Sequence, residues 1–250
     1  MNKIKEFFFE TKLLFRSIPA TLLTLLVVGV VGMNVLANKS IDLPVDWLAL
    51  DAGFLLSWIV FFVMDVTVKR FGLKAANTVS IAASVVNLIV ALIFFLASLI
   101  PGTWSTSYVD GSQSIINNAF DEMFRGTWYI IIGSTAAFVS SAIVNNVICF
   151  FIHKAFKNRT SMKSFMVASY VSTSIGQFVD NFVFALIVSK VFFGWTLLQC
   201  TTCALTGMVL ELLCEVIFSP LGYYFVRRME KNNVGDEYLN HIKNKKELAK

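Results

Sequence analysis

Charged residues are scarce in this sequence. Asp, Glu, Lys and Arg together make up 15% of the 250 residues, whereas apolar residues make up 56%. A soluble globular domain carries about 25% charged residues, because its surface must interact with water. The composition therefore excludes an ordinary soluble domain and indicates a chain that lies mostly within a membrane.

Histidine and cysteine are also rare, with two and four residues respectively. Cys200 and Cys203 form a single C-x-x-C pair, and the sequence has neither a second such pair nor two neighbouring histidines. Since a structural zinc ion needs four ligands close together, we predict no metal site and no cofactor. We expect the cysteines to pack between membrane helices.

Signatures of catalysis are missing as well. The sequence contains no G-x-x-x-x-G-K-[ST] phosphate loop, no H-E-x-x-H zinc motif and no recognisable Ser-His-Asp arrangement. The chain is therefore not expected to hydrolyse ATP through a phosphate loop. We predict that it is not an enzyme.

What the sequence does contain is long apolar runs. A run of about 20 mostly apolar residues is enough to cross a bilayer as a helix. Six such runs occur, at 17–37, 47–64, 75–100, 126–152, 164–189 and 196–226. Because no Gly/Ser-rich or low-complexity linker separates them, we predict one all-α domain over residues 1–230, a six-transmembrane-helix bundle, and a charged cytoplasmic tail at 231–250.

The basic residues predict the orientation of this bundle. All Lys and Arg residues except Lys39, Arg125 and Lys190 lie on one side of it. By the positive-inside rule that side is cytoplasmic, so we predict both termini in the cytoplasm. The formal charge of +5 then reports orientation in the lipid bilayer rather than binding of nucleic acid.

The segment 101–125 is the long loop on the opposite side. Apolar residues between 116 and 124 recur at helical spacing. We expect a short helix that lies on the outer membrane surface and is capped by Asp110 or Ser112.

A polar stripe follows the fifth apolar run. Spacings of three and four place on one helical face Ser169, Thr173, Gln177, Asp180 and Phe184, with Asn181 at the border. A carboxylate at bilayer depth costs ~3 kcal/mol or more, so this face is expected to line the bundle interior or a water-filled cavity. For Gln177, and also for Asp180, a plain hydrogen bond between helices is the alternative.

Four further acids lie in or next to the apolar runs. Glu211 and Glu215 are one helical turn apart in the sixth run. Two carboxylates so close in a low-dielectric interior do not ionise together, so we expect at least one to be protonated; the alternative is one neutral Glu that bonds a neighbouring helix. Asp51 lies near the outer end of the second run, and Asp65 lies at its inner end, where an ion pair with Lys69 is the alternative.

The predicted site combines these acids with amides. The segment SSAIVNNVICFF (140–151) is similar to SIGQFVDNFVFA (174–185). This short match is either an internal repeat of the kind from which transporters build their sites or a chance similarity. The predicted substrate-binding residues are Asp180, Gln177, Asn181, Glu211, Glu215, Asn145, Asn146, Asp51 and Phe184. The predicted proton-coupling residues are Glu211, Glu215 and Asp65.

Four segments occur together in an order that resembles a known family. They are LDAGF (50–54), MDVTVKRFG (64–72), GQFVDNFVFA (176–185) and EVIFSPLGYYFV (215–226). Over residues 40–230 the sequence is similar to the vitamin uptake transporter family, also called the queuosine precursor transporter family.

The resemblance implies a six-helix inner-membrane protein that takes up 7-deazaguanine precursors of queuosine, a modified tRNA nucleoside. It places the family's aspartate at the end of the second span on Asp65, and its intramembrane Gln-x-x-Asp on Gln177 and Asp180. It places the family's glutamate before proline on Glu215 and Pro220.

Two positions depart from the family pattern. Where many members carry a second Gln-x-x-Asp, this sequence has Ala142 and Asn145, and where many carry a lysine it has Glu211. Both departures change the charge of the predicted cavity, so they leave the substrate more open than the fold.

We therefore predict import of a queuosine precursor, a small purine-like base. Asp180 would accept N–H donors of the base or carry a proton that couples its uptake. One alternative is the substrate-binding subunit of an energy-coupling-factor importer with a partner ATPase, although Ala20, Thr24, Gly29 and Gly32 do not form the clean stripe of small residues that such docking uses. Transport of another vitamin-like compound, and a membrane enzyme or assembly factor, are further alternatives. The oligomeric state stays open, a homo-oligomer included.

Overall fold

The computed structural model describes residues 3–41, 43–104, 113–158 and 160–248, and these residues are mostly helical. The elements are α1 (Lys3–Ser17), α2 (Ala20–Leu36), α3 (Phe54–Phe71), α4 (Leu73–Ser98), α5 (Gln113–Ala155), α6 (Met162–Phe184), the π-helix η1 (Ala185–Ser189), α7 (Lys190–Phe192), α8 (Leu197–Lys231) and α9 (Asp236–Leu248). Within the described residues, β structure is limited to a single bridge between Ser40 and Asp51. The all-α prediction is confirmed.

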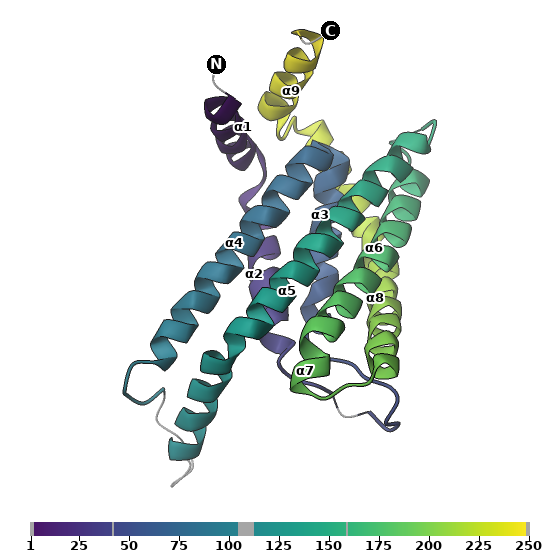
Figure 1. The fold of residues 1–250 in the computed structure, drawn as a ribbon. Helices are drawn as coiled ribbons and strands as arrows, with labels where there is room; N and C mark the ends of the chain where they lie inside the picture. Colours follow the sequence, from purple (N-terminus) through teal and green to yellow (C-terminus); the bar gives the residue numbers. More distant parts are fainter. Residues whose placement is uncertain (1–2, 42, 105–112, 159, 249–250) are drawn as a thin grey trace.

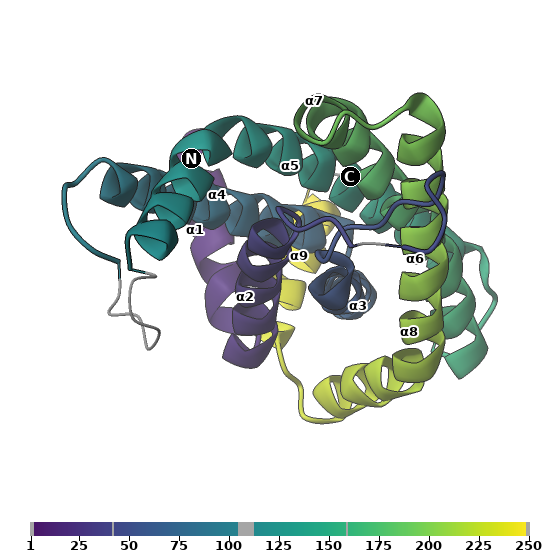
Figure 2. The ribbon, with the colours of Figure 1, turned by 90° about the horizontal axis from the view of Figure 1, so that it is seen from below.

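The long helices form one bundle around α3, which contacts α2, α4, α5, α6 and α8. Figure 2 shows α3 surrounded by these helices. In Figure 1, α1 and α9 lie together at one end of the bundle, which we call the terminal end. The opposite end, where α3 begins and α6 ends, is the loop end.

Helix α3 is buried on all sides through its middle. Every residue from Val60 to Val68 is buried, including Asp65 and Thr67. A helix without an exposed face is covered by other helices all round. By contrast, α4 exposes an apolar stripe of Ile81, Val85, Ile89, Leu92 and Leu96. Exposed apolar surface of this kind fits contact with lipid rather than with water.

Four segments in the described part of the chain are long and apolar enough to cross a membrane. They are α4, residues 129–155 of α5, α6 continued to Phe192, and α8. A fifth is obtained if α1 and α2, bent by 102° relative to each other, are counted as one span. The 18-residue α3 is not among them, because it carries Asp65, Lys69 and Arg70. A multi-pass membrane protein fits these helices, whereas the six-helix count stays a prediction.

The second predicted span is displaced along the chain. The apolar run at 47–64 predicted a helix there, but α3 occupies Phe54–Phe71. Residues 47–53 form a loop that pairs with Ser40 through Asp51. The helix continues past Asp65 because neighbouring helices bury that carboxyl and supply its hydrogen bonds, so it does not need to lie at a membrane surface.

The separate surface helix predicted within 101–125 is also wrong. Residues 113–125 belong to the single long helix α5. The Nε1 atom of Trp104 donates to Asp121 Oδ1 at 2.6 Å, and Arg125 donates to the Ser98 carbonyl at 2.9 Å. These bonds hold the start of α5 against the end of α4. The predicted caps, Asp110 and Ser112, lie outside the described residues.

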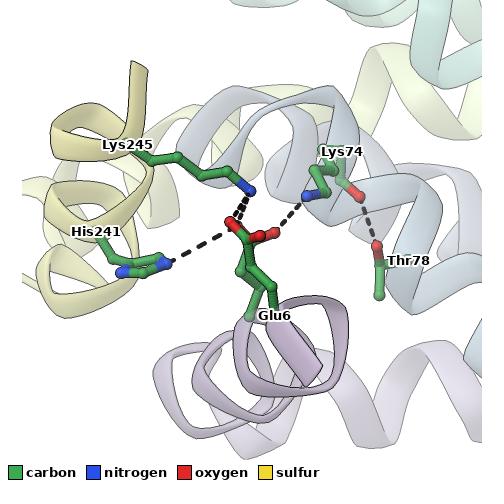
Figure 3. Close-up of polar contacts among 6 residues, drawn as sticks. Glu6, Lys74, Thr78, His241 and Lys245 are labelled. Carbon is green, nitrogen blue, oxygen red and sulfur yellow. Dashed lines mark hydrogen bonds and ion pairs between the residues drawn. The ribbon is translucent and has the colours of Figure 1, made fainter. Parts of the chain in front are cut away.

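The charged segment predicted at 231–250 packs against the rest of the fold. Arg70 of α3 donates to the Val234 carbonyl and to Asp236, both at 2.6 Å. Lys74, His241 and Lys245 converge on the acidic side chains of α1, as Figure 3 shows. We call the ion pairs of Glu6 and Glu10 with Lys74 and Lys245 the α1–α9 clasp.

The clasp shifts the ionisation of its members. Burial raises the pKa of Glu10, but the hydrogen bonds and charges of Lys245 and Lys74 outweigh it, so the pKa is lowered overall. The hydrogen bonds to Glu10 and Glu6 raise the pKa of Lys245 to about 12. Both shifts favour the charged forms, which hold the two terminal helices together.

Candidate functional site

The acids within the bundle form two clusters. The loop-side cluster contains Asp51, Asp180, Asn181 and Glu211. The terminal-side cluster contains Asp65 and Glu215, which meet at Ser169. On α6, Asp180 and Ser169 are 11 residues apart, so the clusters are separated by about 16 Å along that helix at 1.5 Å per residue.

Asp51 is held by the turn that starts α3. Its Oδ1 accepts the Gly53 backbone N–H at 2.8 Å, and the residue is 6% exposed. A Cβ at position 53 would lie 2.8 Å from that oxygen and 2.9 Å from the Met33 carbonyl oxygen. Glycine therefore allows the loop to bring Asp51 against the end of α2.

Asp180 and Glu211 are each bound by one serine. The Ser141 hydroxyl donates to Asp180 Oδ1 at 2.8 Å, and the Ser57 hydroxyl is hydrogen-bonded to Glu211 Oε1. Glu211 is 1% exposed, and its Oε2 has no hydrogen-bond partner among the described residues. Asp51 and Asp180 are close enough for their charges to act on Glu211. The loop-side cluster therefore holds three acids and an unused acceptor.

A small pocket lies against this cluster. Its lining residues come from α2 and its C-terminal end, the loop before α3, and α3, α5 and α6. They are Met33, Asn34, Ala37, Asp51, Gly53, Ser57, Ser134, Ala137, Asp180, Asn181 and Phe184. The cavity volume is about 20 Å³, which is enough for one water molecule. Pockets that hold small molecules measure about 300–1,000 Å³, so this pocket is too small for such a ligand in the structure.

Helices α6 and α8 approach each other closely beside the pocket. A Cβ at Gly207 would lie 2.5 Å from Nδ2 of Asn181. That amide nitrogen also has no hydrogen-bond partner among the described residues. Asn181 therefore offers an unused donor next to the acceptors of the cluster.

Asp65 is the centre of the terminal-side cluster and is fully buried. The Asn145 amide donates to it at 2.9 Å, Thr173 at 3.2 Å and Ser172 at 3.3 Å. Ser169 contacts it as well. These partners are neutral, and Lys69, the alternative partner expected from the sequence, lies with its Nζ 3.2 Å from His153 Nδ1.

The structure separates several residues that the sequence grouped together. Glu211 and Glu215 are neighbours on α8, but they belong to different clusters. Asn145 joins Asp65, whereas Asn146 donates to Asn77 of α4 at 2.8 Å, away from the acids. Phe184 lines the pocket.

Gln177 lies on α6 between the two clusters, about one turn from Thr173 and from Asp180. It is fully buried, and neither its Nε2 nor its Oε1 has a hydrogen-bond partner in the described part of the chain. The helix-to-helix bond that was the alternative for this residue is not seen. An unpaired buried amide costs ~1–3 kcal/mol, so Gln177 is a candidate for a group that is satisfied in another state.

The sequence pattern did not single out the hydroxyl groups that bind Asp180 and Glu211. Ser57 and Ser141 bind Glu211 and Asp180, and Ser134 binds Asn34 at the pocket wall. Serines within apolar helices are too common to stand out alone. The seven-residue spacing of Ser134 and Ser141 on one helical face was the available signal.

A larger cavity of about 600 Å³ lies at the terminal end, and no carboxyl group lines it. Its lining is basic and apolar and includes Lys69, Arg70, His153, Lys154 and Lys243. Because Val68 and Lys69 follow Asp65 within about one turn of α3, this cavity begins just beyond the terminal-side cluster.

Comparisons with known proteins agree with this architecture. Residues 51–225 match the model of a family described as "Putative vitamin uptake transporter". No curated protein and no solved structure matches the chain. The matched segment begins at Asp51, ends after Pro220 and contains every acid of both clusters. The chain belongs to the vitamin uptake transporter family.

Proposed function

We propose that this chain imports a small polar base that carries several N–H donors, of the 7-deazaguanine class from which queuosine is made. The observation that carries the proposal is the loop-side pocket, which Asp51 and Asp180 line and to which no described Lys or Arg contributes. An ionised carboxylate only accepts hydrogen bonds, so the ligand must bring the donors.

The remaining groups of the cluster complement such a base. The free Oε2 of Glu211 is a further acceptor, and the free Nδ2 of Asn181 can donate to a ring carbonyl. Phe184 offers a flat apolar wall for the ring. A precursor with an aminomethyl cation would also be attracted by the acids of this cluster.

The small pocket must widen before it can hold a base. The π-helix Ala185–Ser189 directly follows Phe184, and π-helical turns occur frequently at functional sites. Tyr129 donates to the Ile187 carbonyl at 2.8 Å and so ties this turn to α5. Movement of η1 and α7 away from α5 would open the pocket towards the loop end.

The contacts of α2 speak against an energy-coupling-factor subunit. A Cβ at Gly29 would lie 2.8 Å from Val60, and a Cβ at Gly32 would lie 2.5 Å from Leu56. Both glycines are therefore used to pack α2 on α3. They do not offer a free stripe for a partner protein.

We further propose six crossings, with both termini cytoplasmic and the protein in the inner membrane. In support, α1 and α9 lie at the same end of the bundle (Figure 1). A cysteine introduced at exposed Thr103 should be labelled by a membrane-impermeant thiol reagent from outside, and one at exposed Asn158 should be protected. The reverse pattern would contradict this orientation.

The substrate is tested by uptake rescue. The chain is expressed in cells that cannot make queuosine, and each precursor is supplied separately. The proposal predicts that tRNA modification returns with a 7-deazaguanine precursor, is lost in Asp180→Asn, and persists in Asp46→Asn, which changes an exposed acid at the same end. Absence of rescue with every precursor, despite normal membrane expression, would contradict it.

A further inference from the structure

Outside the proposed ligand site, two buried acids are in contact through one hydroxyl group. Ser169 Oγ is within hydrogen-bond distance of Asp65 Oδ2 and of Glu215 Oε1. Asp65, Ser169 and Glu215 are all fully buried. A serine hydroxyl has one hydrogen, so it can donate to only one of two acceptors. The other contact is a hydrogen bond only if that acid carries a proton and donates it to Ser169.

The remaining partners decide which acid carries the proton. Asp65 receives the amide hydrogen of Asn145 and the hydroxyl hydrogen of Thr173, in addition to Ser169. A carboxylate with several donors is stabilised in its charged form. Glu215 has Ser169 as its partner, and its Oε2 is unpaired within the described residues. A bare Glu215 carboxylate at this depth would be costly.

We propose that Glu215 is a proton-binding site, with the hydrogen-bond order Glu215 O–H to Ser169 Oγ and Ser169 O–H to Asp65 Oδ2. The site can pass its proton on. The O–H bond of Glu215 breaks as a new one forms on Ser169, and the original Ser169 O–H bond breaks as one forms on Asp65. One proton thereby moves from Glu215 to Asp65, and Ser169 is unchanged.

A second buried group, the Asn145 amide, lies beside this site. Asn145 donates its amide nitrogen to Asp65, and its Oδ1 is unpaired although the residue is fully buried. That oxygen is an acceptor held next to the acids, available to a water molecule or to a protonated carboxyl. The cluster therefore has more acceptors than its own hydrogens can satisfy, as a proton site requires.

Other titratable groups around the pair come from three helices. On α5 they are Cys149, which is buried beside Asp65, and His153, one turn further along. On α3, Lys69 follows Asp65 by one turn and contacts His153. On α8, Glu211 precedes Glu215 by one turn, about 6 Å, and Cys214 directly precedes Glu215, close enough for the charge of Glu215 to act on the thiol. His153 and Lys69 line the basic cavity at the terminal end, so the proton site lies between that cavity and the loop-side pocket.

This inference rests on the proposed function, because it assigns the proton to a site separate from the ligand. Glu211 faces the ligand cluster and Glu215 the proton cluster on the same turn of α8. A base bound at Glu211 would place new hydrogen bonds and charge one turn from Glu215 and would change how firmly Glu215 holds its proton. The proton released or taken up would accompany transport of the base.

The test uses infrared spectroscopy of the purified protein without ligand. A protonated buried carboxyl gives a C=O band that an ionised carboxylate lacks and that shifts in deuterated water. Because the buried Glu211 can also carry a proton, the band of Glu215 is read from the difference between the spectra of wild type and Glu215→Gln. We expect this difference spectrum to contain such a band at neutral pH. Glu211→Gln, the matched change one turn away, should keep it. Ser169→Ala should shift its frequency, because the hydrogen-bond partner is gone.

The infrared result does not depend on which substrate the protein carries. Absence of a C=O band from the wild-type minus Glu215→Gln difference spectrum, with normal folding of the variant, would overturn the proton site. Loss of the band when sodium is added to the wild type would show that the cluster binds a cation, and it would also overturn the proposed proton site. In vesicles, Glu215→Gln should lose acceleration of uptake by an inward proton gradient while it retains equilibrium binding. Failure of uptake with every base, with the band intact, would reject the substrate and leave the proton site standing.

Discussion

The loop-side and terminal-side clusters have similar chemistry but differ in how far they satisfy it. Both combine acids with serine hydroxyls and an asparagine. Asp65 receives several donors within the protein, whereas Asp180 receives Ser141 and Glu211 is paired with Ser57. A cavity borders the loop-side cluster. Protein partners therefore satisfy Asp65, whereas Asp180 and Glu211 keep hydrogen-bonding capacity that the proposed ligand would use.

The difference between the two clusters should have its largest effect on thermal stability. Asp65→Leu would leave the donors of Asn145, Ser169 and Thr173 without their acceptor, and each buried unpaired group costs ~1–3 kcal/mol. We expect the purified variant to lose most of its thermal stability in detergent. Asp180→Leu, which removes the acceptor of Ser141 alone, should melt much closer to the wild type. Equal melting temperatures for the two variants would abolish the distinction between the clusters.

A smaller effect is expected from crowding the ligand cluster. The added methyl group of Gly207→Ala would meet Asn181 Nδ2 at 2.5 Å, so Asn181 must move. Overpacking costs ~1–3 kcal/mol, and displacement of the amide should weaken ligand binding in addition. The matched control is Gly102→Ala, where no atom lies within 4 Å of the new Cβ. Unchanged ligand affinity in Gly207→Ala would show that Asn181 does not belong to the ligand site.

The smallest effect is expected at the α1–α9 clasp. Lys74 and Lys245 are more than one-third exposed, and exposed ion pairs contribute ~0–1 kcal/mol. Because the pKa of Glu10 is lowered in the folded protein, its contribution is present above the ordinary Glu value near 4.3. That contribution is lost as pH falls through the lower folded value.

Lys245 titrates in the opposite sense. Its pKa is raised to about 12, so its contribution is lost as pH rises through that value. The measurement is the melting temperature of wild type and Glu10→Gln against pH. The two curves should converge at acid pH and differ most between pH 5 and 10. A constant difference at all pH values would show that Glu10 acts through packing rather than charge.

The sequence revealed the acids but not their grouping. Asp180, Glu211 and Glu215 stood out because a charge in an apolar run is costly. Their partners could not be predicted, since Ser57 and Glu211, or Ser169 and Glu215, are far apart in sequence and meet only in the folded bundle. Spacing on α8 grouped Glu211 with Glu215, whereas tertiary contacts separate them.

The predicted position of the second span was wrong for a related reason. Counting apolar residues ended the second span at 64, next to a charged residue. In the folded protein that residue, Asp65, is enclosed by donors from α5 and α6, so the helix continues to Phe71. Hydropathy describes the preference of a residue for lipid, and α3 is surrounded by protein instead.

The most direct test of the account is equilibrium binding of a 7-deazaguanine precursor to purified wild type and Asp180→Asn, measured by titration calorimetry. A charge-assisted hydrogen bond contributes ~1.5–3 kcal/mol, so the variant should bind about 10- to 100-fold more weakly, with an unchanged melting temperature without ligand. Asp46→Asn should bind like the wild type. Full affinity in Asp180→Asn would contradict recognition of the base at the loop-side cluster.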